Sequence, residues 1–363
     1  MSLGGWMELP SLPMDDWRRI TAIKEPLPDL KTRRTSAGTL ARYYPDYVQL
    51  MGLDENFVEN TVVTSVRQLH GEVEDEKMEM ICEQEVPSAP PPPPHPLYEV
   101  AGYRITDEGR KPFKYRARNV VLATGQADTQ NRLEVAGERL PFVLHSVPEL
   151  EAVVASGKIT SGSDPVLVVG AGLSGADAII SAQGHRLPVA HLFRKRANDP
   201  QLIFAKLPGN LYPEYHAVHA MMDGRSEAKI NKSTNVDFEE GAKMYTAWAE
   251  SEVIEILENQ RVVIRGPQGT HTLNVSYVVV LIGSSPNLSF LSSQGDQLGR
   301  VRGHAIDRNN TIDISPFTHQ SNNVPGLFAL GPLTGDNFVR FIQGGALAIA
   351  SHVHQTRRST YSD

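Results

Sequence analysis

Near its middle the sequence reads Pro165-Val166-Leu167-Val168-Val169-Gly170-Ala171-Gly172-Leu173-Ser174-Gly175. The apolar run before Gly170 predicts a short buried strand, and residues 173–183 predict a helix. A second apolar strand is expected at 189–193, which gives the order strand, helix, strand. Further strands are expected at 119–123, 273–282 and 327–330, and a last helix at 344–354. Strands that alternate with helices predict an α/β fold with a parallel sheet.

The three glycines follow a GxGxxG spacing in the turn between a strand and a helix. In this setting Gly170 allows a tight turn, Gly172 lets a pyrophosphate approach the backbone, and Gly175 lets the helix pack against the strand. The phosphates would bind the N–H groups at the N-terminus of the predicted helix, where Leu173 and Ser174 are the first residues. The sequence therefore predicts a dinucleotide-binding turn. The alternative is a tight turn without a ligand.

A basic turn follows the second strand, with the sequence Phe193-Arg194-Lys195-Arg196. Sites for NAD or FAD place an acidic residue there to bind the ribose hydroxyls, whereas cations suit a 2′-phosphate. We therefore predict that Arg194, Lys195 and Arg196 select NADPH. A solvated basic turn is the alternative.

Composition excludes several classes of protein. The 363 residues contain 35 Lys and Arg against 42 Asp and Glu, and a net charge of −7 argues against a nucleic-acid-binding protein. Cys82 is the single cysteine, so an intrachain disulphide or a CxxC motif is excluded. The sequence lacks an apolar run of transmembrane length and a signal-peptide pattern. We expect an intracellular, cytoplasmic protein without a membrane-spanning segment.

Residues 71–96 differ from the rest because an acidic run leads into prolines, including Pro90 to Pro94. Such a segment favours polyproline II over sheet, and we expect a disordered, exposed insertion between two strands. His216 and His219 stand three residues apart beside Glu214. A third ligand is missing from this pattern, so we expect no metal site.

Three further segments resemble motifs of flavoproteins with two dinucleotide-binding domains. Val121-Leu122-Ala123-Thr124-Gly125 resembles the motif at the first crossing between their FAD and NADPH domains. Val279-Val280-Leu281-Ile282-Gly283 resembles the second crossing, and the segment from Val324 to Gly331 resembles the C-terminal flavin motif. The resemblance implies cofactor contacts at Thr124, Gly125, Gly283 and Gly331. Typical members have Gly-Asp where this chain has Gly331-Pro332, and Asp336 could take over part of that role.

The finer resemblance is to the oxidative stress-induced growth inhibitor family, which is related to flavin-containing monooxygenases. It rests on several long sequence motifs that occur in the same order along the chain. Among them are Gly5-Trp6-Met7-Glu8-Leu9-Pro10, Leu211-Tyr212-Pro213-Glu214-Tyr215-His216 and Gly335-Asp336-Asn337-Phe338-Val339-Arg340-Phe341. The resemblance implies an FAD- and NADPH-dependent oxidoreductase of monooxygenase type that acts on a small-molecule substrate. It also implies a role in the oxidative-stress response, growth inhibition and the regulation of cell death. No residue is assigned a catalytic role.

In this family a segment before the Gly5-Trp6 motif contains the first strand and a GxGxxG motif that binds FAD. Four residues precede Gly5 here, and the chain has no second GxGxxG. We therefore expect an N-terminally incomplete FAD-type domain over 1–162, an NADPH-binding Rossmann-like domain over 163–284, and the C-terminal part of the FAD-type domain over 285–363. FAD retention by this form is in question. A non-catalytic NADPH-binding regulatory protein or a truncated isoform stays open as the alternative.

Overall fold

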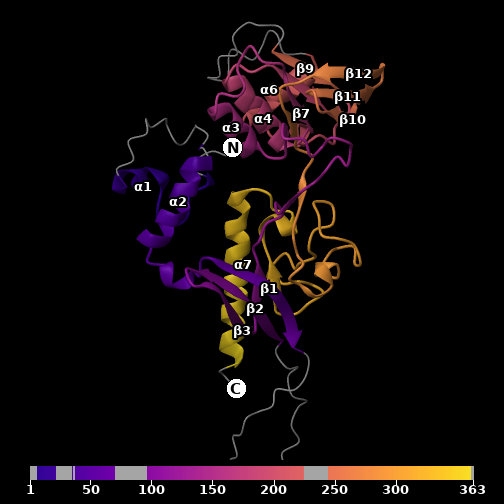
Figure 1. Ribbon diagram of the computed structural model, residues 1–363. Coiled ribbons are helices and arrows are strands. Elements are labelled where there is room, and N and C mark those ends of the chain that lie inside the picture. Colours follow the sequence, from indigo (N-terminus) through magenta and orange to yellow (C-terminus); the bar gives the residue numbers. More distant parts are fainter. Residues whose placement is uncertain (1–5, 22–34, 36, 70–95, 225–243, 361–363) are drawn as a thin grey trace, which may run out of the picture. The chain divides into compact units, whose positions relative to one another are not determined.

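The structure is a computed structural model that describes residues 6–21, 35, 37–69, 96–224 and 244–360 (Figure 1). It divides into two compact units. Unit 1 contains Met1–Thr129 and Ser285–Asp363, and unit 2 contains Gln130–Ser284. Unit 2 is thus one continuous segment inserted into unit 1. The expected insertion over 71–96 falls, apart from Pro96, outside the described residues.

Unit 2 is built on a five-stranded parallel sheet with the strand order β6-β13-β7-β8-β9. The strands are β6 (Val143–Leu144), β7 (Val166–Val169), β8 (Val189–Leu192), β9 (Tyr245–Trp248) and β13 (Val278–Val280). All residues of the three central strands are buried, as expected for a parallel sheet that is covered on both faces.

One face of this sheet is covered by helices and the other by a three-stranded antiparallel meander. The helices of unit 2 are α3 (Val147–Ala155), α4 (Leu173–Gly184), α5 (Ile203–Lys206) and α6 (Pro213–Met222). The meander strands are β10 (Glu252–Leu257), β11 (Arg261–Gly266) and β12 (Gly269–Asn274). Leu167 and Val169 pack against Val262 and Ile264 of the meander. The predicted strand–helix–strand order around the glycine-rich turn is confirmed.

Two boundaries in unit 2 differ from those expected from the sequence. The single strand expected at 273–282 is wrong: Leu273 pairs antiparallel with β11, and Val278 begins β13, which pairs parallel with β7. Between them the chain passes from the meander to the main sheet, and the apolar residues Leu273, Val275 and Tyr277 hide this break in the sequence. The first unit boundary lies at 129/130 rather than at 162, because β6 pairs with β13 and so belongs to the sheet of unit 2.

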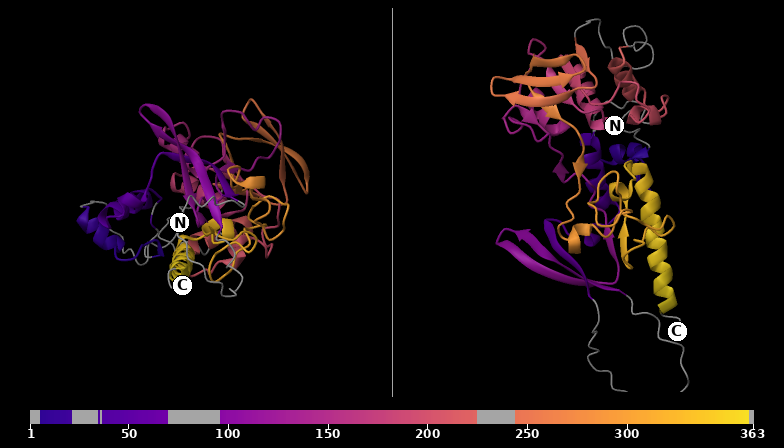
Figure 2. Two further views of the ribbon diagram at one scale, coloured as in Figure 1. Left: turned by 90° about the horizontal axis from the view of Figure 1, so that it is seen from below. Right: turned by 90° about the vertical axis from the view of Figure 1, so that its right-hand side faces the viewer.

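Unit 1 combines several small elements around its own cores (Figure 2). Its helices are α1 (Met14–Ile20), α2 (Ala37–Leu50) and α7 (Val339–Thr360), with 3-10 turns η2 (Asp54–Asn56), η4 (Ser292–Gly295) and η5 (Gly331–Thr334). Its strands are β1 (Thr61–Leu69), β2 (Leu97–Thr106) and β3 (Gly109–Ala117) in an antiparallel sheet, and β4 (Val120–Leu122) with β15 (Leu327–Ala329) in a parallel pair. Ile349 of α7 packs against Phe328 of β15. The helix expected at 344–354 is confirmed and is longer.

The parallel pair β4–β15 is incomplete as a sheet within the described residues. Strand β4 is paired with β15 and with no second strand in the described part of the chain. Val121, in the middle of β4, is 43% exposed, whereas its register partner Phe328 is fully buried. The two crossings between the units pair with each other as β5 (Thr129–Gln130) and β14 (Ser284–Ser285). Among the described residues, no helix is both long and apolar enough to span a membrane.

Candidate dinucleotide-binding site

The glycine-rich turn of unit 2 joins β7 to α4, and its three glycines meet different surroundings. At Gly170, where φ is +122°, an added Cβ would lie 2.3 Å from the carbonyl oxygen of Leu281. At Gly175 an added Cβ would lie 2.4 Å from the carbonyl oxygen of Gly170. At Gly172 an added Cβ would meet no heavy atom within 4 Å. Backbone packing therefore requires Gly170 and Gly175, whereas Gly172 borders open space that a ligand can enter.

The same turn presents the N-terminus of α4. Gly172 is the N-cap in an extended conformation, and the first intrahelical bond runs from the Ala176 N–H to the Gly172 carbonyl at 3.1 Å. The amide groups of Leu173, Ser174 and Gly175 precede this bond, and the first turn contains no acidic residue. Such a helix end carries a partial positive charge and attracts phosphate groups.

The three cations predicted after β8 are not equivalent in the structure. Lys195 Nζ donates to Gln201 Oε1 at 3.1 Å and lies 3.8 Å from Asp199 Oδ2. Arg196 Nε donates to Glu250 Oε1 at 3.0 Å. Arg194 is exposed, and within the described ranges its side chain has no ion pair or hydrogen bond. Its guanidinium is therefore the one best placed to meet an anion.

A cavity of about 440 Å³ lies beside Arg194. It is lined by Arg194, Glu250, Ser251, Glu252, Arg265, Gly266 and Pro267. The Ser251 N–H donates to the Phe193 carbonyl at 3.1 Å, which brings the start of the meander against the end of β8. Arg265 is already paired with Glu252. Of the two arginines that line this cavity, Arg194 is the one without a carboxylate partner among the residues that the structure describes.

The structure also reveals a buried residue behind the turn that the sequence analysis missed. His191 on β8 is fully buried, and its Nε2 lies 2.9 Å from the Gly170 carbonyl oxygen. Its Nδ1 lies 2.7 Å from the Tyr245 hydroxyl on β9. Burial lowers the pKa of His191 to about 4, so the imidazole is neutral at physiological pH. A polar residue at the third position of an otherwise apolar strand was the signal available in the sequence.

The residues predicted to contact the flavin gather where the parallel strands β4 and β15 end. Thr124 and Gly125 follow β4, and Gly331 follows β15. Both glycines have positive φ, +72° at Gly125 and +71° at Gly331. The Asp336 N–H donates to the Gly331 carbonyl at 3.1 Å, so Asp336 returns to the end of β15.

A side-chain bond links the two loops of this cluster. Gln126 Nε2 donates to Asn337 Oδ1 at 3.1 Å, which joins the loop after β4 to the loop after β15. Four of the predicted site residues of unit 1 are thereby brought to one edge. The pair Gln126–Asn337 was not predicted, because its members are 211 positions apart and Gln126 lies outside the quoted motifs.

Gly283 belongs to unit 2 and lies at the same carboxyl edge of the sheet as the glycine-rich turn. The Leu281 N–H donates to the Val169 carbonyl at 2.8 Å, so the end of β13 runs beside the end of β7. Gly283 has φ of +99°, and its carbonyl accepts from the Asn131 N–H at 3.0 Å. The predicted residues thus form two groups, one in each unit.

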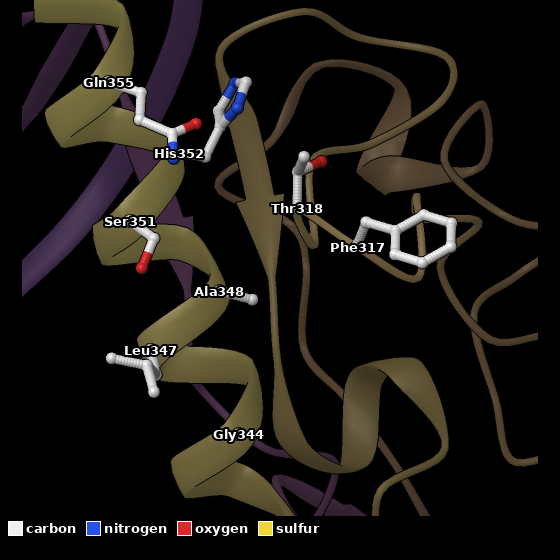
Figure 3. Close-up of a pocket in the computed structure, with 8 residues that line it drawn as sticks. All are labelled: Phe317, Thr318, Gly344, Leu347, Ala348, Ser351, His352 and Gln355. Atoms are coloured by element: carbon white, nitrogen blue, oxygen red, sulfur yellow. The ribbon is translucent and has the colours of Figure 1, made fainter.

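Other features stand apart from these groups. His216 Nε2 lies 2.8 Å from the Leu207 carbonyl oxygen, and His219 Nε2 lies 2.7 Å from that of Ala197, so both bind backbone. Figure 3 shows a second cavity, of about 480 Å³, where α7 faces the loop of Phe317 and Thr318. None of the predicted site residues lines this second cavity.

Comparison with known proteins identifies the family of the chain. The sequence profile of the pyridine nucleotide-disulphide oxidoreductases matches residues 98–353. Oxidative stress-induced growth inhibitor 1 of Mus musculus is 43% identical over 354 residues, which are 97% of this chain and 68% of that protein. Oxidative stress-induced growth inhibitor 2 of Homo sapiens is 41% identical over 354 residues, with 96% and 68% covered.

Solved structures of similar fold include two reductases. Bacillithiol disulfide reductase from Bacillus cereus superposes with a TM-score of 0.58 at 18% identity, covering 91% of this chain and 82% of its own. Thioredoxin reductase from T. acidophilum has a TM-score of 0.53 at 18% identity, with 88% and 81% covered. At this identity the likeness concerns the fold alone: an α/β fold of the FAD- and NAD(P)-binding type. The chain belongs to the oxidative stress-induced growth inhibitor family and carries the domain of the pyridine nucleotide-disulphide oxidoreductases.

Proposed function

We propose that the chain is an NADPH- and FAD-dependent oxidoreductase of monooxygenase type, active in the oxidative-stress response, growth inhibition and cell-death regulation. The observations that support the cofactor choice are the open space at Gly172 and the exposed Arg194, which has no ion pair with any described residue and lines a cavity of about 440 Å³. The family membership supports an oxidoreductase, and its name supports the link to oxidative stress.

The residues of unit 2 fit an NADPH molecule. A ligand can reach the backbone at Gly172, where a Cβ would otherwise stand in open space. The amides of Leu173 and Ser174 would hold the pyrophosphate, and Arg194 would hold the 2′-phosphate. When bound, NADPH supplies a hydride and a flavin accepts it. The protein groups hold the phosphates and orient the dinucleotide along the carboxyl edge of the sheet.

The residues of unit 1 fit part of a flavin site. Thr124, Gly125 and Asp336 would border it, and Gly331-Pro332 offers one amide fewer than a Gly-Asp pair because proline has no N–H. These 363 residues contain no second GxGxxG to hold the pyrophosphate of FAD. They also contain one cysteine, so a redox disulphide within the chain is unavailable.

The test is an absorption spectrum of the desalted protein, followed by NADPH oxidation with oxygen consumption. Bound flavin and NADPH-dependent oxygen uptake would support the proposal. NADPH binding without flavin, even after FAD is added, would refute the enzyme and favour a regulatory NADPH-binding protein. Absence of NADPH binding would contradict both.

Arg194→Ala is expected to weaken NADPH binding by ten- to one-hundredfold and NADH binding by less than twofold. A hydrogen bond to a charged group contributes roughly 1.5–3 kcal/mol, and NADH lacks the 2′-phosphate that would receive it. Fluorescence titration with both nucleotides measures the two dissociation constants. Arg261→Ala is the control, since it removes one exposed cation of unit 2 that does not line the cavity. Equal losses for NADPH and NADH in Arg194→Ala would refute the assignment.

A further inference from the structure

We propose that His191 is a positioning residue for dinucleotide binding: it holds the Gly170–Ala171 peptide in the orientation that the glycine-rich turn needs. Tyr245 in turn holds His191. This inference rests on the proposed NADPH binding and assigns a role to two residues outside the GxGxxG motif.

The contacts run across three neighbouring strands. His191 lies on β8 in register with Val168 of β7, and Tyr245 begins β9, which pairs parallel with β8. The imidazole spans from the Tyr245 hydroxyl at 2.7 Å to the Gly170 carbonyl oxygen at 2.9 Å. His191 is fully buried among apolar strands, where a polar side chain is costly unless its hydrogen bonds are satisfied.

The chemistry of the partners determines which atom donates. The Gly170 carbonyl oxygen can only accept, so His191 Nε2 carries the proton. In a neutral imidazole Nδ1 then accepts, and the Tyr245 hydroxyl donates to it. Burial lowers the pKa of His191 to about 4 and raises the pKa of Tyr245, so both groups stay neutral around pH 7. Each hydrogen-bonding group of the imidazole has one partner.

The hydrogen bond fixes the direction of a whole peptide plane. In a trans peptide the C=O and the N–H point in opposite directions. When the Gly170 carbonyl points to His191, the Ala171 N–H points away from His191. Gly175 packs against the same carbonyl oxygen, where an added Cβ would lie at 2.4 Å. Without the donor, the carbonyl of the half-buried Gly170 loses its hydrogen-bond partner, and rotation of the peptide toward solvent becomes more favourable.

The experiment compares four variants of the full chain. His191→Phe removes both hydrogen bonds and keeps a ring of similar size. His191→Gln keeps an N–H donor and an acceptor, and Tyr245→Phe removes only one hydroxyl. His216→Phe is the matched control, because it breaks another bond from an imidazole to a backbone carbonyl, at Leu207, away from the turn. NADPH dissociation constants, thermal unfolding and amide hydrogen exchange of residues 170–176 are measured for each.

We expect NADPH binding to weaken at least tenfold in His191→Phe and to recover to within threefold of wild type in His191→Gln. Tyr245→Phe should fall between them, and His216→Phe should match wild type. Amide exchange of residues 170–176 should quicken in His191→Phe without any nucleotide present. His216→Phe shows how much the NADPH dissociation constant and the amide exchange change for a given drop in unfolding temperature when only a structural bond is lost. In His191→Phe both changes should be larger than its own drop in unfolding temperature explains on that scale.

Several results would overturn the inference. Wild-type affinity in a folded His191→Phe would overturn it while leaving the proposed NADPH binding intact. A His191→Gln as weak as His191→Phe would reduce His191 to a packing role. If His191→Phe fails to fold, unchanged affinity and exchange in Tyr245→Phe would still contradict it. A wild-type protein that binds no NADPH would overturn the inference and the proposed function together.

Discussion

Gly172→Val is expected to abolish NADPH binding while the protein stays folded. A Cβ at Gly172 meets no heavy atom within 4 Å, and Gly172 has an extended conformation with φ of −93°, so the backbone can carry a side chain there. The same side chain would fill the path by which the pyrophosphate reaches the amides at the start of α4. We expect the dissociation constant to rise at least one-hundredfold, which corresponds to about 3 kcal/mol.

Isothermal titration with NADPH and a thermal unfolding scan test this together. Gly184→Val is the control, because Gly184 lies at the other end of α4 and also borders open space. It should bind NADPH like wild type. Unchanged affinity in Gly172→Val would show that the dinucleotide does not cross this turn.

Gly175→Val is expected to behave in the opposite way to Gly172→Val: its main effect is a lower free energy of unfolding, and any loss of NADPH binding follows from that. An added Cβ would lie 2.4 Å from the Gly170 carbonyl oxygen, which is backbone and cannot move without displacing β7. Overpacking of this kind costs about 3 kcal/mol. The loss should appear as faster amide exchange across β7 and α4 and as earlier urea unfolding of unit 2.

Here too Gly184→Val serves as the reference, since it adds the same side chain to the same helix. A Gly175→Val protein that is as stable as Gly184→Val would mean that helix and strand are not held in close contact at this point. Together the two variants distinguish a glycine that leaves room for a ligand, Gly172, from a glycine that is required by packing, Gly175.

Sequence reasoning predicted the glycine-rich turn well because its signal is local. About twenty consecutive positions contain the strand, the three glycines at fixed spacing and the helix. Each of these has its own recognisable pattern. The sequence also placed Thr124, Gly125 and Gly331 at strand ends and Asp336 in the loop that follows, and the structure brings all four to one edge of unit 1. Their contact with a flavin stays a prediction.

What the sequence could not show depends on partners that are distant along the chain. Arg194, Lys195 and Arg196 look alike in the sequence, and only Glu250 and Gln201 distinguish them by engaging the latter two. His191 reads as one polar residue in an apolar strand until Tyr245 and Gly170 are seen beside it. The break at 275–277 leaves no mark in the sequence because Leu273, Val275 and Val278 are apolar on both sides of it, although β12 and β13 join different sheets.

The insertion of unit 2 into unit 1 has a consequence for the order of folding. The pairing of β4 with β15 brings together residues on either side of unit 2. Closing an unstructured loop of roughly 200 residues between β4 and β15 costs about 5 kcal/mol of chain entropy. Once the inserted segment has folded, its two ends are held side by side by β5 and β14, the loop left to close shortens to roughly 50 residues, and the cost falls by about 1 kcal/mol. Nascent chains should therefore acquire protected amides in β7 and β8 before β4 and β15 meet, an order that pulsed hydrogen exchange during refolding can record.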